Sequence, residues 1–174
     1  MIDRAIGGFP SPSVILTIVD PTASPELLIY NLSDGSYYLP TIKSPEIVEE
    51  EMRMLGFNAI LVEKIDDLEK LANCKVVVEF TFGVDEAVRI REIAMRNGLI
   101  VYLVVLKDYY DEKTTNILKY VCNGIIIVEA EKIGERFVYR FAIPKMIGGN
   151  SLSSYIRFKT ERSVLEIDTS RDIV

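Results

Sequence analysis

The sequence contains no histidine, tryptophan or glutamine, and its only cysteines are Cys74 and Cys122. Without histidine the chain lacks the commonest general base and a frequent zinc ligand. Neither cysteine has a C-x-x-C neighbour, and each lies in an apolar or helical stretch, so we expect both in the core. These absences exclude a zinc site and a Cys–His nucleophile. The missing residue types, beside abundant Glu, Lys and Ile, also point to a thermophilic source.

Long apolar runs are absent as well. No stretch reaches the ~20 residues that a membrane-spanning helix needs. The first residues, Met1, Ile2, Asp3 and Arg4, do not form the charged-then-apolar pattern of a signal peptide. We therefore expect a cytoplasmic protein.

Clustered basic charge is the third feature that is missing. The net charge is −6, and basic residues are scattered among acids, as where Glu49, Glu50 and Glu51 precede Arg53. Nucleic-acid binding depends on grouped Lys and Arg that displace counterions from phosphates. Direct binding of DNA or RNA by this chain is not expected.

What the sequence does contain is a regular alternation of two patterns. Short apolar runs bounded by turn residues indicate strands buried on both faces, as in parallel sheets. Helical patterns separate them, one of which begins at Ser44 as N-cap with Pro45 at the first helical position and ends at Gly56. This alternation predicts an α/β, doubly wound sheet. The predicted strands are residues 14–19, 58–62, 76–80, 99–106 and 124–128, and the predicted helices are 45–55, 66–71, 85–96 and 114–121.

The end of the chain has a different pattern. Residues 136–143, 155–159 and 164–168 alternate polar with apolar side chains, with Gly148 and Gly149 in the first connection and residues 161–163 in the second. Such segments are typical of half-exposed antiparallel strands at a sheet edge. We therefore expect a single domain over residues 1–174, with a mainly parallel core at about 10–130 and antiparallel C-terminal strands at about 136–170.

The loop after the first predicted strand is where α/β proteins bind phosphates. A P-loop there reads G-x-x-x-x-G-K-[ST], since glycines let backbone amides surround phosphate, Lys supplies charge and Ser/Thr binds magnesium. Residues 19–26 read VDPTASPE instead. The spacing from the strand fits a P-loop, but the residues do not.

The flanking segments make the comparison specific, because they resemble the KaiC-type ATPases of the RecA superfamily. Matches to the family's motifs follow one another in order across almost the whole chain. Residues 2–16 resemble "LDxxLGGGIPxGSxxLI", 38–46 resemble "LYVTxEESPE", 76–81 resemble "VVIDSLS", 120–126 resemble "YLADGII" and 139–148 resemble "RxLxIxKMRG".

This resemblance implies a RecA-like, P-loop NTPase-type fold with a degenerate Walker A motif. In the alignment it implies, Val19 takes the place of the first glycine, Ser24 the last glycine, Pro25 the lysine and Glu26 the Ser/Thr. Glu79 falls on the Walker B aspartate. These five are interpreted as vestigial phosphate-loop and Walker B positions, with no catalytic residue among them.

Further departures concern the catalytic base and the subunit contact. The family's paired catalytic glutamates fall on Ile42 and Lys43, which supply no carboxylate. The Lys and Arg that reach a neighbouring subunit's nucleotide in that family fall on Lys145 and Ile147, so only the lysine remains. We expect no cofactor and no hydrolysis, although residual nucleotide binding stays open.

Ordinary structural roles are also available at these positions. Ser24 as N-cap, Pro25 at the first helical position and Glu26 in the first turn would make a well-formed helix start, so residues 19–26 are expected to close on themselves. Glu79 could hold a metal, but pairing with a basic neighbour is the better expectation, and no metal site is predicted.

Three residues are candidates for contacts with another protein. Lys145 could meet a neighbouring subunit or be a solvated loop lysine. Tyr109 and Tyr110 lie in a loop expected to be exposed after a central strand, where aromatic side chains suit a protein contact.

Three functions remain open. The favoured one is a catalytically inactive KaiC/RecA-like protein, a structural or regulatory subunit that forms homo-oligomers or assembles with an active paralogue. The second is an ATPase or sensor that still binds a nucleotide in an altered way through Glu79 and Lys145. The third is an accessory paralogue in DNA recombination or repair, which rests on analogy of fold.

Overall fold

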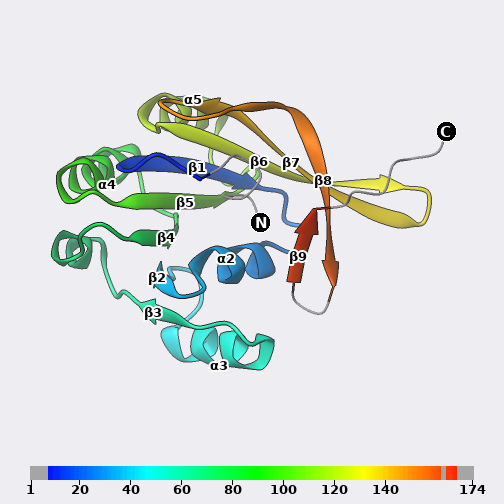
Figure 1. Cartoon of the computed structure of the whole chain (residues 1–174), viewed down its shortest axis with the longest axis horizontal. Coiled ribbons are helices and arrows are strands. Elements are labelled where there is room, and N and C mark those ends of the chain that lie inside the picture. Colours follow the sequence, from blue (N-terminus) through cyan, green and yellow to red (C-terminus); the bar gives the residue numbers. More distant parts are fainter. Residues whose placement is uncertain (1–7, 162–163, 168–174) are drawn as a thin grey trace.

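A computed structural model describes residues 8–161 and 164–167, which form a nine-stranded sheet with the order β3-β2-β4-β5-β1-β6-β7-β8-β9 (Figure 1). From β3 to β6 all neighbouring strands are parallel, and from β6 to β9 they are antiparallel. The predicted α/β sheet with antiparallel C-terminal edge strands is therefore confirmed. The strands are β1 (Ser13–Val19), β2 (Ser36–Leu39), β3 (Ala59–Leu61), β4 (Lys75–Glu79), β5 (Ile100–Leu106), β6 (Gly124–Ile133), β7 (Arg136–Met146), β8 (Leu152–Glu161) and β9 (Val164–Ile167).

Helices cover both faces of the parallel part. One hydrophobic cluster joins the sheet to α2 (Pro25–Ser33) and α3 (Pro45–Leu55), and it also takes in side chains of β7 and β8. A second cluster lies on the opposite face, under α4 (Val84–Asn97), α5 (Glu112–Val121) and the 3-10 helix η1 (Ile65–Lys70). Strands β1, β4 and β5 are buried between the two layers because apolar side chains occupy both of their faces.

The helix boundaries follow local signals. Gly56 and Gly98 adopt left-handed φ values of 80° and 67° at the ends of α3 and α4, a conformation that costs glycine little. Ser44 lies at the N-cap position of α3, but its side chain makes no capping hydrogen bond. Helix α3 itself has the bounds that the sequence predicts.

Three elements depart from the sequence predictions. Strand β3 is an edge strand rather than one buried on both faces, and its Ile60 is 59% exposed. The segment predicted as a helix at residues 66–71 is the 3-10 helix η1, which has fewer residues per turn than an α-helix. Strand β2 was not predicted as a strand, because its Ser-Tyr-Tyr-Leu sequence is short and partly polar.

Of the two cysteines, Cys122 is buried, and this burial raises the pKa of its thiol to about 12. Cys74 is only half-buried, so the expectation of a core position holds for one of the pair. Parts of the predicted motifs fall outside the described residues: residues 2–7 of the opening motif, the turn at 162–163 and the last residue of the predicted strand 164–168.

Within the described residues, no helix combines the length and apolarity needed to cross a membrane.

The central position of β1 gives a direct test of the fold. Ile15 is completely buried in the cluster that joins the sheet to α2 and α3, so Ile15→Ala should lower the free energy of unfolding by about 2–5 kcal/mol through lost burial and a residual cavity. The control is Ile60→Ala on the exposed edge strand, where a change within about 0.5 kcal/mol is expected. Equal losses in the two variants, measured by urea denaturation, would contradict the placement of β1.

Candidate functional site

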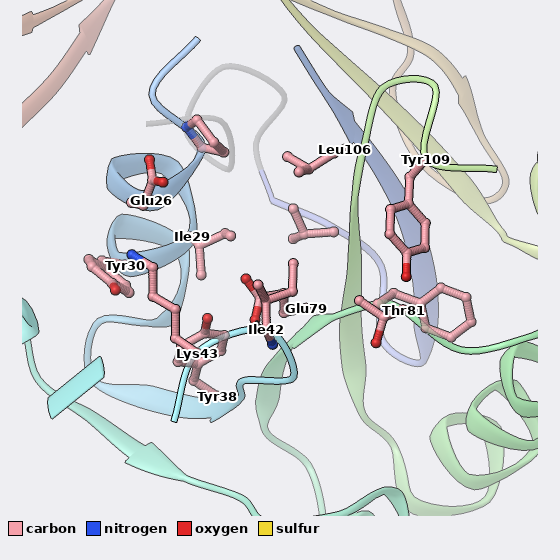
Figure 2. Close-up of a pocket in the computed structure, with 13 residues that line it drawn as sticks. Glu26, Ile29, Tyr30, Tyr38, Ile42, Lys43, Glu79, Thr81, Leu106 and Tyr109 are labelled. Atoms are coloured by element: carbon pink, nitrogen blue, oxygen red, sulfur yellow. Dashed lines mark hydrogen bonds between the residues drawn. The ribbon is translucent and has the colours of Figure 1, made fainter. Parts of the chain in front are cut away.

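A cavity of about 130 Å³ lies where β2, β4 and β5 end, beside the beginning of α2 (Figure 2). This is the carboxyl edge of the parallel sheet, at which doubly wound proteins bind their ligands. Most of its walls are apolar or aromatic. The lining residues are Pro25, Glu26, Ile29, Tyr30, Tyr38, Ile42, Lys43, Glu79, Phe80, Thr81, Val104, Leu106 and Tyr109.

The loop between β1 and α2 closes around the side chain of Asp20. The Asp20 Oδ1 atom accepts hydrogen bonds from the Thr22 amide at 2.9 Å and from the Thr22 hydroxyl at 2.6 Å. The Ala23 amide donates to the Asp20 carbonyl at 2.9 Å. The Thr22 hydroxyl is the largest cause that lowers the pKa of Asp20. Two loop amides are thus used inside the turn, and the segment closes on itself as the sequence predicts.

The start of α2 differs from the predicted cap. Ser24 has a left-handed φ of 51° and its side chain makes no capping hydrogen bond, whereas a capping serine normally has an extended backbone. The turn around Asp20 is followed by Pro25 at the first helical position. The left-handed backbone of Ser24 lets the chain change direction between the two. Pro25 and Glu26 occupy the predicted first turn, with Pro25 buried and Glu26 exposed. Val19 is a buried residue at the end of β1.

Glu79 is held by backbone groups. Its Oε2 atom accepts hydrogen bonds from the amides of Thr41 and Ile42, each at 2.9 Å. The Thr41 hydroxyl donates to the Glu79 carbonyl at 2.8 Å. In the described part of the chain no basic side chain forms an ion pair with Glu79, so the expected basic partner is not found there. The chain that leaves β2 turns its amides toward the end of β4 instead, and the carboxylate accepts from them.

Lys43 belongs to a separate polar group at the edge of the cavity. Its ammonium donates to both Glu51 oxygens, at 2.9 and 2.7 Å, and Glu51 also accepts a hydrogen bond from the Tyr30 hydroxyl. The hydrogen bond from Lys43 is the main cause that lowers the pKa of Glu51, followed by that from Tyr30. Burial, and then the contact with Glu51, raises the pKa of Tyr30. The neighbouring Ile42 is 57% exposed.

The two candidate tyrosines have different surroundings. The Tyr110 hydroxyl donates to the carbonyls of Phe82 and Phe80, and burial raises its pKa to about 12. Tyr109 packs edge-on against Tyr110 with ring centroids 4.8 Å apart, is 50% exposed and lines the cavity. Tyr109 therefore offers more free surface than Tyr110, and an interface role for either stays a prediction.

Lys145 lies away from this cavity, on β7. Its ammonium donates to the carbonyls of Lys119 and Cys122, each at 2.7 Å, at the carboxyl end of α5. A cation there donates to the terminal carbonyls and interacts favourably with the partial negative charge at the end of the helix. Its side chain is half-buried rather than fully solvated, and contact with another subunit stays a prediction.

Among residues 8–161 and 164–167, no group of three or more Cys, Asp or Glu side chains is arranged to hold a metal ion. The structure thus brings Pro25, Glu26, Glu79 and Tyr109 to one cavity and leaves Lys145 elsewhere. Sequence reasoning did not single out Asp20 or the Lys43–Glu51–Tyr30 group. An aspartate two residues before a threonine is a signal for an Asx turn, whereas no sequence signal joins Lys43 to Tyr30.

No protein-family model matches the sequence, and no curated protein matches it. The structure does match the crystal structure of a KaiC-like protein from the hyperthermophilic archaeon Pyrococcus horikoshii OT3, with a TM-score of 0.72 over 95% of this chain and 94% of that chain. The chain has a KaiC-like fold. Sequence identity to that protein is 13%, so the match concerns the fold. In this KaiC-like fold the cavity lies beside the loop between β1 and α2.

The Lys43–Glu51 pair predicts a pH dependence of stability. Because the pKa of Glu51 is lowered on folding from its ordinary value of 4.5, its contribution is present above that value and is lost as the pH falls through the folded-state pKa. From about pH 5 down to about pH 3 the wild type should therefore lose more unfolding free energy than Glu51→Gln. Thermal unfolding across this range measures the difference, with Glu63→Gln as an exposed control; parallel curves for all three proteins would contradict the assignment.

Proposed function

We propose that this KaiC-like chain neither binds nor hydrolyses ATP and acts as a structural or regulatory subunit through assembly with other protein chains. The observation that carries the proposal is the turn closed by Asp20, in which the amides of Thr22 and Ala23 already have acceptors inside the protein. A phosphate-binding loop needs such amides free to face the ligand. The fold is retained while the groups that would hold a nucleotide are engaged elsewhere.

Charge supports the same proposal. The position of the phosphate-binding lysine holds the buried Pro25, and the next residue is Glu26. One unit charge pair at about 4 Å is worth roughly 4 kcal/mol at an effective dielectric constant of about 20. Loss of that attraction together with an added repulsion corresponds to several orders of magnitude in affinity for a triphosphate, at about 1.4 kcal/mol for each factor of ten.

The positions of the catalytic glutamates give a third line of support. Ile42 carries an apolar side chain, and the Lys43 ammonium is engaged by Glu51. Neither can accept a proton from an attacking water, because one has no ionisable group and the other is a cation in an ion pair. Recovery of hydrolysis would thus need changes both at residues 19–26 and at residues 42–43.

The nucleotide part of the proposal is tested by calorimetry. Titration of the purified chain with ATP and ADP, with and without magnesium, should give no binding up to about 1 mM. Phosphate release should not exceed that of buffer, and an active KaiC-like ATPase with a complete P-loop serves as positive control. Micromolar binding would instead favour a nucleotide sensor that uses an altered site.

Exposed apolar side chains near the end of α5 offer a surface for assembly. Tyr120 is 85% exposed and Ile147 is 58% exposed. The two segments meet here, because the Ile147 amide donates to the carbonyl of Asn123 just after α5. Aromatic residues such as Tyr120 are enriched in interface cores, and the neighbouring Ile147 adds apolar surface. The occupant we propose is a second KaiC-like subunit, either a copy of this chain or a paralogue.

The double substitution Tyr120→Glu with Ile147→Glu tests this surface. Two buried charges would oppose association, so the complex formed by the wild type should shift to monomer in gel filtration with light scattering, by at least about tenfold in dissociation constant. The control is Ile60→Glu on the edge strand β3, away from this surface, which should leave the complex intact. A wild-type chain that is monomeric alone and also fails to bind an active KaiC-like paralogue from the same source would contradict the proposal.

A further inference from the structure

The cavity described above differs in its chemistry from a phosphate site, and it is well formed. Its deep part consists of buried side chains, among them Tyr38, Phe80 and Val104. Its mouth is formed by more exposed residues, among them Ile42 and Tyr109 (Figure 2). The volume of about 130 Å³ is comparable to an apolar cavity of about 150 Å³ that takes up benzene.

One carboxylate oxygen in this apolar cavity has capacity for a ligand. Glu79 is half-buried, and both backbone amides that fix its position donate to Oε2. Among the residues that the structure describes, no group donates a hydrogen bond to Oε1 and no basic side chain forms an ion pair with Glu79. In Figure 2 the Glu79 side chain lies in the middle of the labelled residues, between Ile29 of α2 and Thr81.

The charges around the cavity favour a cation. Its lining contains Glu26, Glu79 and one basic residue, Lys43, and the charge of Lys43 is opposed by Glu51. Burial, and then the charge of Glu79, raises the pKa of Tyr38 at the cavity floor. Aromatic residues also line the cavity, and aromatic faces attract organic cations.

From this combination we infer that the cavity binds a small organic amine, whose ammonium pairs with Glu79 Oε1 and whose apolar group fills the space between α2 and β5. An ammonium supplies the donor that this oxygen lacks and forms a charge-assisted hydrogen bond. The volume accommodates an aromatic ring or branched alkyl group of about six carbon atoms. This ligand site goes beyond the proposed assembly role and does not depend on it.

The alternatives fit the cavity less well. A phosphate or carboxylate would face Glu26 and Glu79 with Lys43 already paired. A neutral apolar molecule would fill the space but leave the Glu79 oxygen without a donor, which costs free energy when water is displaced. The two classes therefore serve as comparison ligands.

The experiment compares three probes of the same size and different charge: benzylamine, benzyl alcohol and benzoate. Calorimetry and amide chemical-shift changes at pH 7 in low salt should show benzylamine binding with a dissociation constant on the order of 1 mM. Benzyl alcohol should bind about tenfold more weakly, and benzoate and inorganic phosphate about 100-fold more weakly or not at all. Equal binding of benzoate or phosphate, or no benzylamine binding at about 20 mM, would overturn the inference.

Variants locate the site. Glu79→Gln keeps an oxygen for the Thr41 and Ile42 amides but removes the charge, and it should weaken benzylamine binding at least about tenfold while leaving benzyl alcohol unchanged. Leu106→Trp fills the cavity from β5 without touching Glu79, so it should abolish binding of both even if Glu79→Gln fails to fold. Glu63→Gln, an exposed carboxylate away from the cavity, is the matched control. Unchanged benzylamine affinity in Leu106→Trp would show that the amine binds elsewhere and would refute the proposal.

Discussion

Backbone amides that emerge at the carboxyl edge of a parallel sheet need acceptors, and in this chain two carboxylates supply them. Asp20 accepts from the loop after β1, and Glu79 accepts from the segment after β2. These three hydrogen bonds from backbone amides to carboxylates are charge-assisted and help to fix the conformation of both loops. The direction of α2 and the shape of the cavity follow from that arrangement, because α2 begins directly after the Asp20 turn and the Glu79 side chain forms part of the cavity wall.

The use of internal carboxylates also sets the sign of the charge at this edge. In phosphate-binding α/β proteins the amides and a lysine create a positive potential for an anionic ligand. Here the acceptors that satisfy the amides are themselves anionic, and Lys43 is paired with Glu51. Around the cavity the charged lining residues are two carboxylates and one lysine that is already paired, which favours a cation over a polyanion. Shape and chemistry at this edge are set by different residues, which is how one fold can carry different functions.

Much of the fold could be predicted from the sequence, because buried parallel strands appear as continuous apolar runs. The segments now seen as β1, β4 and β5 are of this kind, and α3 has both a proline at its start and a glycine at its end. β3 could not be assigned correctly, because an apolar run does not reveal whether a strand lies inside the sheet or at its edge. β2 is too short and too polar to stand out.

The candidate site was predictable in position but not in detail. The spacing of Pro25 and Glu26 from the first strand placed them at the start of α2, and the motif comparison placed Glu79 at the end of β4. The sequence could not show that Glu79 accepts from the amides of Thr41 and Ile42, because those contacts join segments 38 and 37 positions apart. The left-handed backbone of Ser24 could not be predicted either, because a serine before a proline normally indicates a capping residue with an extended backbone.

The contact of Lys145 with the end of α5 has a mechanical consequence. β7 belongs to the antiparallel extension and α5 belongs to the parallel core, and this one ammonium bridges the carbonyls of Lys119 and Cys122 to the strand. If the antiparallel strands move, the Lys145 contact transmits that movement to the last turn of α5. This helix lies on the opposite face of the sheet from α2. Force applied to the β6–β7 hairpin would reach the helical layer through that side chain as well as through the strand pairing.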